Sequence, residues 1–112
     1  MIIKTNNLTG VDLNWAVAKC EGMENQSGMW AGYKWVGIPY ITDWAQGGPI
    51  IERHRIEICH LDNGEWRAQL NANQWGFHCR HYGESPLIAA MRCYVASKLG
   101  DDVEIPEALC NQ

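Results

Sequence analysis

Residues 85–100 read SPLIAAMRCYVASKLG, and this stretch sets the architecture that the rest of the chain must fit. Ser85 is a typical N-cap residue, and Pro86 suits the first helical position, where no backbone donor is lost. A helix is therefore predicted from Pro86 to about Leu99, ending at Gly100.

The predicted helix 86–99 has apolar residues on more than one side, whereas a simple surface helix has a single apolar stripe. The main stripe consists of Ile88, Met91, Val95 and Leu99, widened by Leu87 and Tyr94; a strip of small residues consists of Ala89, Cys93 and Ala96. We expect one face to cover a sheet and the other to touch a second element. That element is either the first helix or the same helix of a second copy.

The sheet is predicted from the segments that precede this helix. Apolar and polar residues alternate over 55–60 and again over 66–70, as in half-buried strands. Between them, Asn63 and Gly64 supply the two positive-φ positions of a type I′ hairpin turn. A third strand is predicted over 75–80, where Trp75, Phe77 and Cys79 alternate with other residues.

A first helix is predicted from about Gly10 to Glu21, stopping at Gly22. Thr9 and Asp12 have the spacing of a capping box. Two apolar stripes lie on opposite sides of this helix, so we expect it to be sandwiched between two layers.

The order of elements predicts a single α+β domain over residues 1–112, with a helix, an antiparallel sheet of about three to four strands, and a second helix. Residues 23–32 are predicted as loop and 33–36 as a short strand. Residues 103–106 are predicted as extended, and 107–110 as a last helical turn.

The candidate site lies in residues 40–52, which read YITDWAQGGPIIE. Residues 40–42 are predicted as extended, and Asp43–Pro49 as a shaped loop without helical or strand periodicity. The glycines permit unusual backbone angles or close approaches, and Pro49 fixes the exit of the loop.

Two interpretations of this loop remain open. In one, Trp44 fills the core and Asp43 caps the following turn through a local hydrogen bond. In the other, the loop binds a ligand or partner, with Tyr40 and Trp44 as an aromatic wall and Asp43 and Gln46 as polar selectors. Gly47 and Gly48 complete this candidate site, because their amides could form an anion-binding nest.

The charge, the length of the apolar runs and the cysteine count indicate which partners and which compartment to expect. The formal net charge is −4 with acidic and basic residues interspersed, which argues against a nucleic-acid partner. No apolar run reaches the ~20 residues of a membrane span. The five cysteines are odd in number and irregularly spaced, which favours reduced thiols in a cytosol.

Catalytic and metal-binding patterns are weak. Cys59-His60 and the run 78–81, which reads HCRH, contain zinc-ligand types, but strand alternation sends adjacent side chains to opposite faces. A cysteine nucleophile beside a histidine, or Asp43 facing Glu52, would lack any fixed geometry. We therefore predict no catalytic residue, no metal site and no cofactor.

Three stretches carry a family resemblance. Residues 43–53 (DWAQGGPIIER) and 86–100 (PLIAAMRCYVASKLG) resemble the two signature blocks of the NinX-like family of small bacteriophage and prophage proteins, and residues 13–22 resemble its opening helix. The resemblance implies a phage accessory protein acting in the cytoplasm of the bacterial host. It implies no established biochemical activity, so no catalytic residues carry over.

The leading hypothesis is a non-enzymatic binding protein, expected to form a homo-oligomer, that engages a host protein or a small nucleotide-like ligand through the loop. Phage accessory proteins often serve host takeover or counter-defence, which makes this role plausible by analogy. The alternative is a small nucleotide-processing or nucleotide-sequestering protein that uses the Asp43–Gly48 loop. If it is an enzyme, the chemistry is expected on Asp43 or on a Cys/His pair. That chemistry requires a cleft in which Asp43 lies beside a histidine or cysteine.

Overall fold

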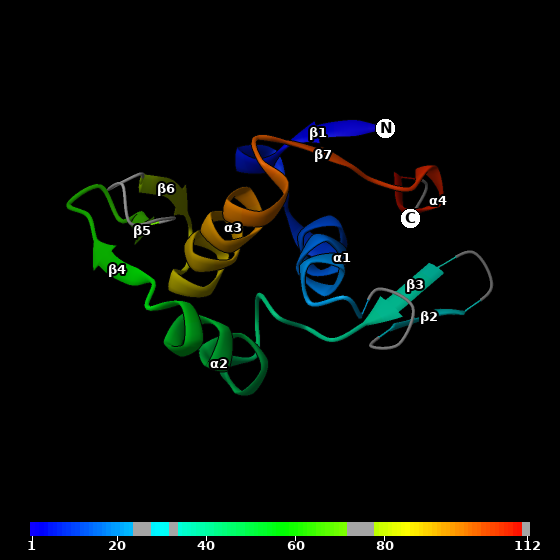
Figure 1. Ribbon diagram of the computed structural model, residues 1–112, viewed down its shortest axis with the longest axis horizontal. Helices are drawn as coiled ribbons and strands as arrows, with labels where there is room; N and C mark the ends of the chain where they lie inside the picture. The colour runs from blue at the N-terminus through cyan, green and yellow to red at the C-terminus, as the bar shows by residue number, and fades with distance from the viewer. Residues whose placement is uncertain (24–27, 32–33, 72–77, 111–112) are drawn as a thin grey trace.

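The computed structural model describes residues 1–23, 28–31, 34–71 and 78–110 (Figure 1). In chain order the elements are β1 (Ile2–Lys4), the 3-10 helix η1 (Thr5–Asn7), α1 (Gly10–Cys20), β2 (Gly28–Ala31), β3 (Lys34–Gly37), α2 (Trp44–His54), β4 (Glu57–His60), β5 (Trp66–Asn71), β6 (His78–Gly83), α3 (Pro86–Leu99), β7 (Asp102–Glu104) and α4 (Glu107–Cys110). The strands pair antiparallel as β1-β7, β2-β3 and β4-β5-β6, which confirms the predicted α+β class.

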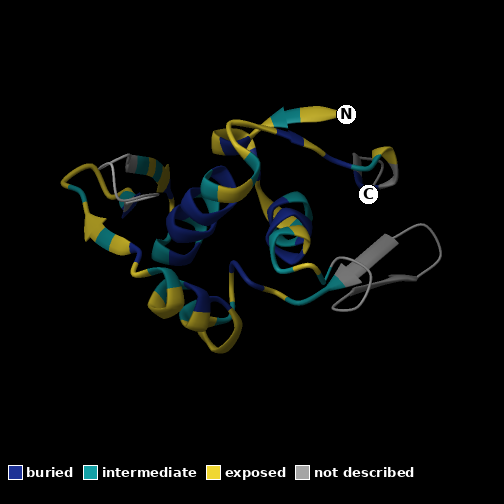
Figure 2. Cartoon of the chain, viewed as in Figure 1, coloured by how far each residue is buried: buried dark blue, intermediate teal, exposed yellow. Residues whose placement is uncertain are grey.

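Helix α3 is the centre of the molecule (Figure 2). Its buried residues are Leu87, Ala89, Ala90, Met91, Cys93, Tyr94, Val95 and Ala96. One side packs on β4, β5 and β6, and another packs on α1. The predicted second neighbour is therefore the first helix of the same chain. The Ser85 cap is confirmed, because its Oγ accepts a hydrogen bond from the amide of Ile88 at 3.2 Å.

The β4–β5 hairpin is confirmed, but its turn type differs from the prediction. Leu61 donates its amide to the carbonyl of Glu65 at 2.8 Å, and Gly64 donates to the carbonyl of Leu61 at 3.1 Å. Gly64 has φ of +88°, whereas Asn63 does not have a positive φ. The loop is thus a three-residue turn that ends in a left-handed glycine, instead of a two-residue type I′ turn.

The third strand of this sheet is β6, which pairs with β5 from His78 to Gly83. It begins later and runs further than the predicted 75–80 segment. Trp75 and Phe77 lie outside the described residues. At the other end of β6, a Cβ on Gly83 would lie 2.7 Å from the amide nitrogen of Ala89, so the strand approaches α3 too closely for any larger residue.

Helix α1 is buried on several sides, as its two apolar stripes predicted. Leu13, Trp15 and Val17 are all buried, and the helix contacts α3, β3 and α4. The capping-box prediction is wrong, because Thr9 makes no side-chain bond to the first turn. Gly22 follows the helix with φ of +70°, as expected for a helix stop.

The remaining segments extend the core at its edges. Residues 28–31 form β2 where a loop was predicted, and they pair with the predicted short strand, β3. The extended tail forms β7, which pairs with β1, and the last predicted turn is α4. None of the described helices is long and apolar enough to span a membrane.

Candidate binding site at the start of helix α2

Residues 44–54 form helix α2 where the sequence predicted a loop as far as Pro49. Residues 40–42 form a turn, instead of the extended segment predicted there. The Gly47-Gly48-Pro49 run opposes helix formation, since glycine and proline are the poorest helix formers. Tertiary packing outweighs this propensity: Ile50 is buried and Ile51 packs against the core.

Asp43 is the N-cap of α2. Its Oδ1 accepts a hydrogen bond from the amide of Ala45 at 2.9 Å, and its carbonyl accepts from Gln46 and Gly47 at 3.0 Å each. These bonds satisfy donors that a helix start otherwise leaves unpaired. The predicted capping role of Asp43 is confirmed.

Gly47 lies at a close approach between three segments. A Cβ at this position would be 2.5 Å from the carbonyl oxygen of Tyr40 and 2.6 Å from Cδ2 of Leu87. The absence of a side chain therefore lets α2 pack directly on the 40–42 turn and on the start of α3. Gly48 has more space, since its nearest atom would be Cε3 of Trp44 at 3.8 Å.

The two aromatic residues of the predicted wall occupy different environments. Tyr40 is buried, with 5% of its surface exposed, whereas Trp44 is 53% exposed. The interpretation of Trp44 as a core residue is wrong. Tyr40 supports the turn from inside, and Trp44 is the member of the pair that presents its ring to solvent.

Trp44 borders a hollow of about 420 Å³ between the 40–42 turn and the start of α3. Its lining consists of Ile41, Thr42, Trp44, Glu84, Ser85, Pro86, Leu87 and Ile88. Of the six predicted site residues, only Trp44 lines this hollow. Asp43 and Gly47 lie outside it, where they fix the start of α2. Gln46 is exposed and Gly48 is half-buried on the same helix.

The geometry does not form an anion-binding nest. The amides of Gln46 and Gly47 are already bonded to the Asp43 carbonyl, and Glu84 places a carboxylate at the hollow. Asp43 is the N-cap of α2 and Glu52 lies in its last turns. At a rise of about 1.5 Å per residue, the two residues are separated by more than two turns of helix and do not face each other. Neither histidine nor cysteine is among the described lining residues, so the arrangement that the enzyme hypothesis requires is not formed there.

The other end of α2 carries a polar cluster that the sequence analysis did not identify. The Tyr94 hydroxyl and Arg53 both donate to Oε2 of Glu21, the latter at 2.7 Å. Arg53 Nε donates to Nε2 of His54 at 3.3 Å, and the His54 ring lies 4.8 Å from the Tyr94 ring. The cluster joins the end of α1, α2 and α3. In the sequence, the feature that could have indicated this cluster is the Arg53-His54 pair at the end of an amphipathic segment.

The cluster shifts the titration of its members. Burial raises the pKa of Glu21, but the hydrogen bonds from Tyr94 and Arg53 outweigh burial and hold this pKa below its ordinary value. Burial, with a smaller contribution from Arg53 and Lys98, lowers the pKa of His54. Burial followed by the bond to Glu21 raises the pKa of Tyr94. Glu21 is thus a carboxylate and His54 a neutral acceptor at neutral pH.

The cysteines and histidines do not converge on a reactive centre within the described part of the chain. Burial raises the pKa of Cys93 to about 12, and its thiol donates to the carbonyl of Cys79 at 3.1 Å. A thiol with so high a pKa is a poor nucleophile at neutral pH. No group of three or more His, Cys, Asp or Glu residues among those described could hold a metal ion.

Comparison with known proteins identifies the family to which the chain belongs. A family model for the NinX protein of bacteriophage P22 matches residues 4–98, which include α1, α2, the strands β2 to β6 and all of α3 except Leu99. The chain belongs to the NinX family. No curated protein matches the chain. In this NinX-family protein the matched region contains every residue of the Trp44 hollow and of the Glu21–Tyr94 cluster.

Proposed function

We propose that this NinX-family chain is a non-enzymatic binding protein that acts in the cytoplasm of the phage-infected bacterium and engages a host protein through the Trp44 hollow. The single observation that supports it is the exposure of Trp44, 53%, beside a hollow whose lining includes Ile41, Pro86 and Leu87. Tryptophan is enriched among the residues that dominate protein interfaces, because it buries a large apolar area and still offers one donor.

A host protein fits this site better than a nucleotide does. The Gln46 and Gly47 amides are used inside α2, and Glu84 would repel a phosphate. The apolar residues Ile41, Pro86 and Leu87 instead suit an aliphatic or aromatic side chain of a partner. Host takeover or counter-defence is the role that phage family membership favours, by analogy alone.

Trp44 is the residue on which partner binding should depend most. Trp44→Ala is expected to remove the specific host protein that co-purifies with the tagged chain from infected cells, weakening its binding by about 30-fold, equivalent to about 2 kcal/mol for an interface hot spot. Quantitative mass spectrometry of the captured proteins measures the loss. A photoreactive residue at Thr42 identifies the bound surface.

The matched control is Ile2→Ala. Ile2 is 66% exposed and lies on β1, on the opposite side of the molecule from α2 (Figure 1). It should retain every partner that the wild-type chain captures. Recovery of the same host proteins with Trp44→Ala and with the wild-type chain would remove the hollow from the proposal. Native mass spectrometry of the purified chain would reveal a retained nucleotide, which would favour the alternative ligand class.

A further inference from the structure

Strand β4 has one backbone edge without a strand beside it. The sheet order is β4-β5-β6, so β5 occupies one edge of β4, and α3 covers one of its faces. No described strand pairs with the other edge, which lies at the outer side of the molecule (Figure 1). An edge of this kind presents unpaired donors and acceptors to solvent.

The hairpin bonds define which residues point outward from this edge. The amide of Leu61 donates to the carbonyl of Glu65, so the backbone groups of Leu61 point toward β5. Along an antiparallel strand, the backbone groups of successive residues point alternately to one edge and to the other. Cys59 and Glu57 therefore also bond toward β5, opposite Arg67 and Gln69, and the backbone groups of Ile58 and His60 point outward. The His60 carbonyl receives only a weak contact from the Cys59 thiol, with Sγ and O 3.6 Å apart.

We propose that the outer edge of β4 pairs antiparallel with β4 of a second copy, about a two-fold axis that passes through Cys59. This interface is separate from the Trp44 hollow. In this register Ile58 lies opposite His60 of the other copy and His60 lies opposite its Ile58. Each pair exchanges two backbone bonds, so every outward group of the strand is satisfied. The axis is perpendicular to the sheet, so both cores remain on one side.

The side chains of β4 agree with this two-fold register. The two Cys59 residues form a pair without mutual backbone bonds, with Cα atoms about 4.5 Å apart, on the solvent face. Cys59 is exposed in the single chain. On the other face the half-buried Ile58 meets His60 of the second copy, which extends the apolar contact that His60 makes with Trp66 at 4.6 Å.

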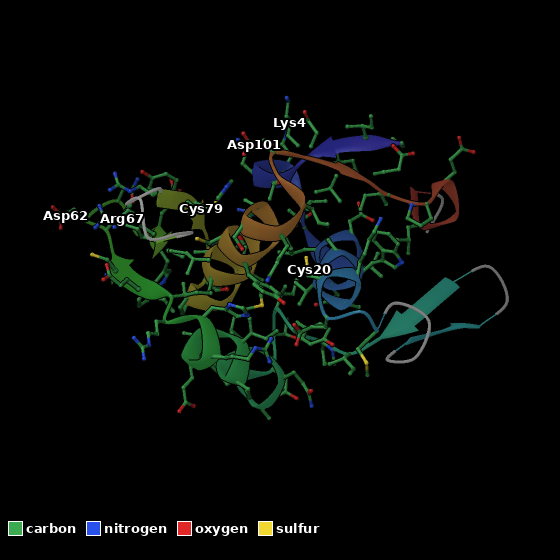
Figure 3. The ribbon with its side chains drawn as sticks, in the orientation of Figure 1. Lys4, Cys20, Asp62, Arg67, Cys79 and Asp101 are labelled. Atoms are coloured by element: carbon green, nitrogen blue, oxygen red, sulfur yellow. The ribbon has the colours of Figure 1, made fainter. Side chains whose placement is uncertain are left out.

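The charges at the two ends of β4 are complementary under the same axis. Arg55 precedes the strand, and Asp62 lies in the turn that follows it. Both side chains are without an ion pair among the described residues, and Asp62 projects from the outer end of the hairpin (Figure 3). An antiparallel two-fold brings Arg55 of each copy to the end that carries Asp62 of the other. An opposite-charge contact is therefore formed twice, as in isologous dimers.

Oxidative cross-linking tests the register directly. The wild-type chain, treated with copper-phenanthroline, should form a disulfide-linked dimer on non-reducing gels, and Cys59→Ser should lose it. The matched control places the cysteine two residues away on the same face, as Glu57→Cys in the Cys59→Ser background. Residue 57 lies opposite Leu61 of the second copy, so this variant should not cross-link. Equal cross-linking at positions 57 and 59 would indicate random collision and would overturn the proposed pairing.

Two further variants test the interface without a cysteine. His60→Pro removes an outward amide and leaves the bonds to β5, so native mass spectrometry should show monomer in place of dimer, while circular dichroism still shows a folded chain. Arg55→Asp and Asp62→Arg should each weaken the dimer, and the double exchange should restore it. A dimer that survives His60→Pro, or a double exchange that fails to restore it, would disprove the inference. Trp44→Ala should leave the dimer intact, which separates this result from host-protein binding.

Discussion

Gly47 shows how a single residue positions the candidate site. Its missing side chain leaves room for the Tyr40 carbonyl and for the side chain of Leu87, which is one of the residues lining the Trp44 hollow. Because one of these neighbours is backbone, it cannot rotate away from an added methyl group. The distance between α2 and the start of α3 is therefore set at this residue.

Adjacent glycines in α2 should respond in opposite directions to alanine. Gly47→Ala is expected to destabilise the chain by about 1–3 kcal/mol through overpacking. Gly48→Ala meets only an ordinary contact at 3.8 Å, and should stabilise it by up to about 1 kcal/mol because alanine is the better helix former. Urea unfolding of both variants measures the two values. Equal effects would contradict the close approach at Gly47.

The Tyr94 hydroxyl is the buried donor of the cluster that joins the three helices. Tyr94→Phe leaves the Glu21 carboxylate without one of its two donors, so we expect a loss of about 1.5–3 kcal/mol at neutral pH. Tyr82→Phe is the matched control, since Tyr82 is 44% exposed and its hydroxyl makes no bond to a described residue. Urea unfolding measures the loss of unfolding free energy in both variants. A loss for Tyr94→Phe as small as that for Tyr82→Phe would show that the Tyr94–Glu21 hydrogen bond does not stabilise the fold.

At the scale of elements, the helix starts differ in how they are capped. Asp43 accepts a bond from the first turn of α2, whereas Thr9 makes no such bond at α1. Asp43→Ala should therefore lower the free energy of unfolding by about 1 kcal/mol, and Thr9→Ala should lower it distinctly less. Denaturation midpoints of the two variants test this ranking. A larger loss at Thr9 would restore the capping box that the sequence predicts.

The elements that could be predicted are those whose local signals agree with their packing. For α3, the Ser85-Pro86 start, the apolar stripes and Gly100 all indicate the same helix, and the β4–β5 hairpin has alternation together with Asn-Gly. Helix α2 could not be predicted, because Gly47, Gly48 and Pro49 oppose a helix locally. The tertiary packing of Ile50 and Ile51 on the core stabilises it, and sequence periodicity does not reveal that packing. The cluster of Glu21, Arg53 and Tyr94 joins residues distant in sequence, which periodicity does not reveal.

For the whole molecule, two partly buried histidines predict acid sensitivity. Burial lowers the pKa of both His54 and His81 below the ordinary value of 6.5, outweighing the opposing effects of Glu21 and Asp101. The unfolded chain therefore binds more protons as the pH falls through 6.5, and stability present above that value is lost below it.

Urea unfolding between about pH 7.5 and pH 5.5 should show this loss, with a slope of at most about 1.4 kcal/mol per pH unit for each histidine. His54→Gln should reduce the slope and leave the contribution of His81. A wild-type stability that does not change over this range would contradict the assignment of both histidines as neutral in the folded chain.

The central position of α3 has a consequence for biosynthesis. Helix α1 and strands β4, β5 and β6 all rest their apolar sides on α3, yet all precede it in the chain. While the ribosome adds residues at about 5–20 per second, these earlier segments have no surface on which to bury those sides. The nascent chain thus emerges with its core unassembled, and folding waits until residues 86–99 have left the exit tunnel.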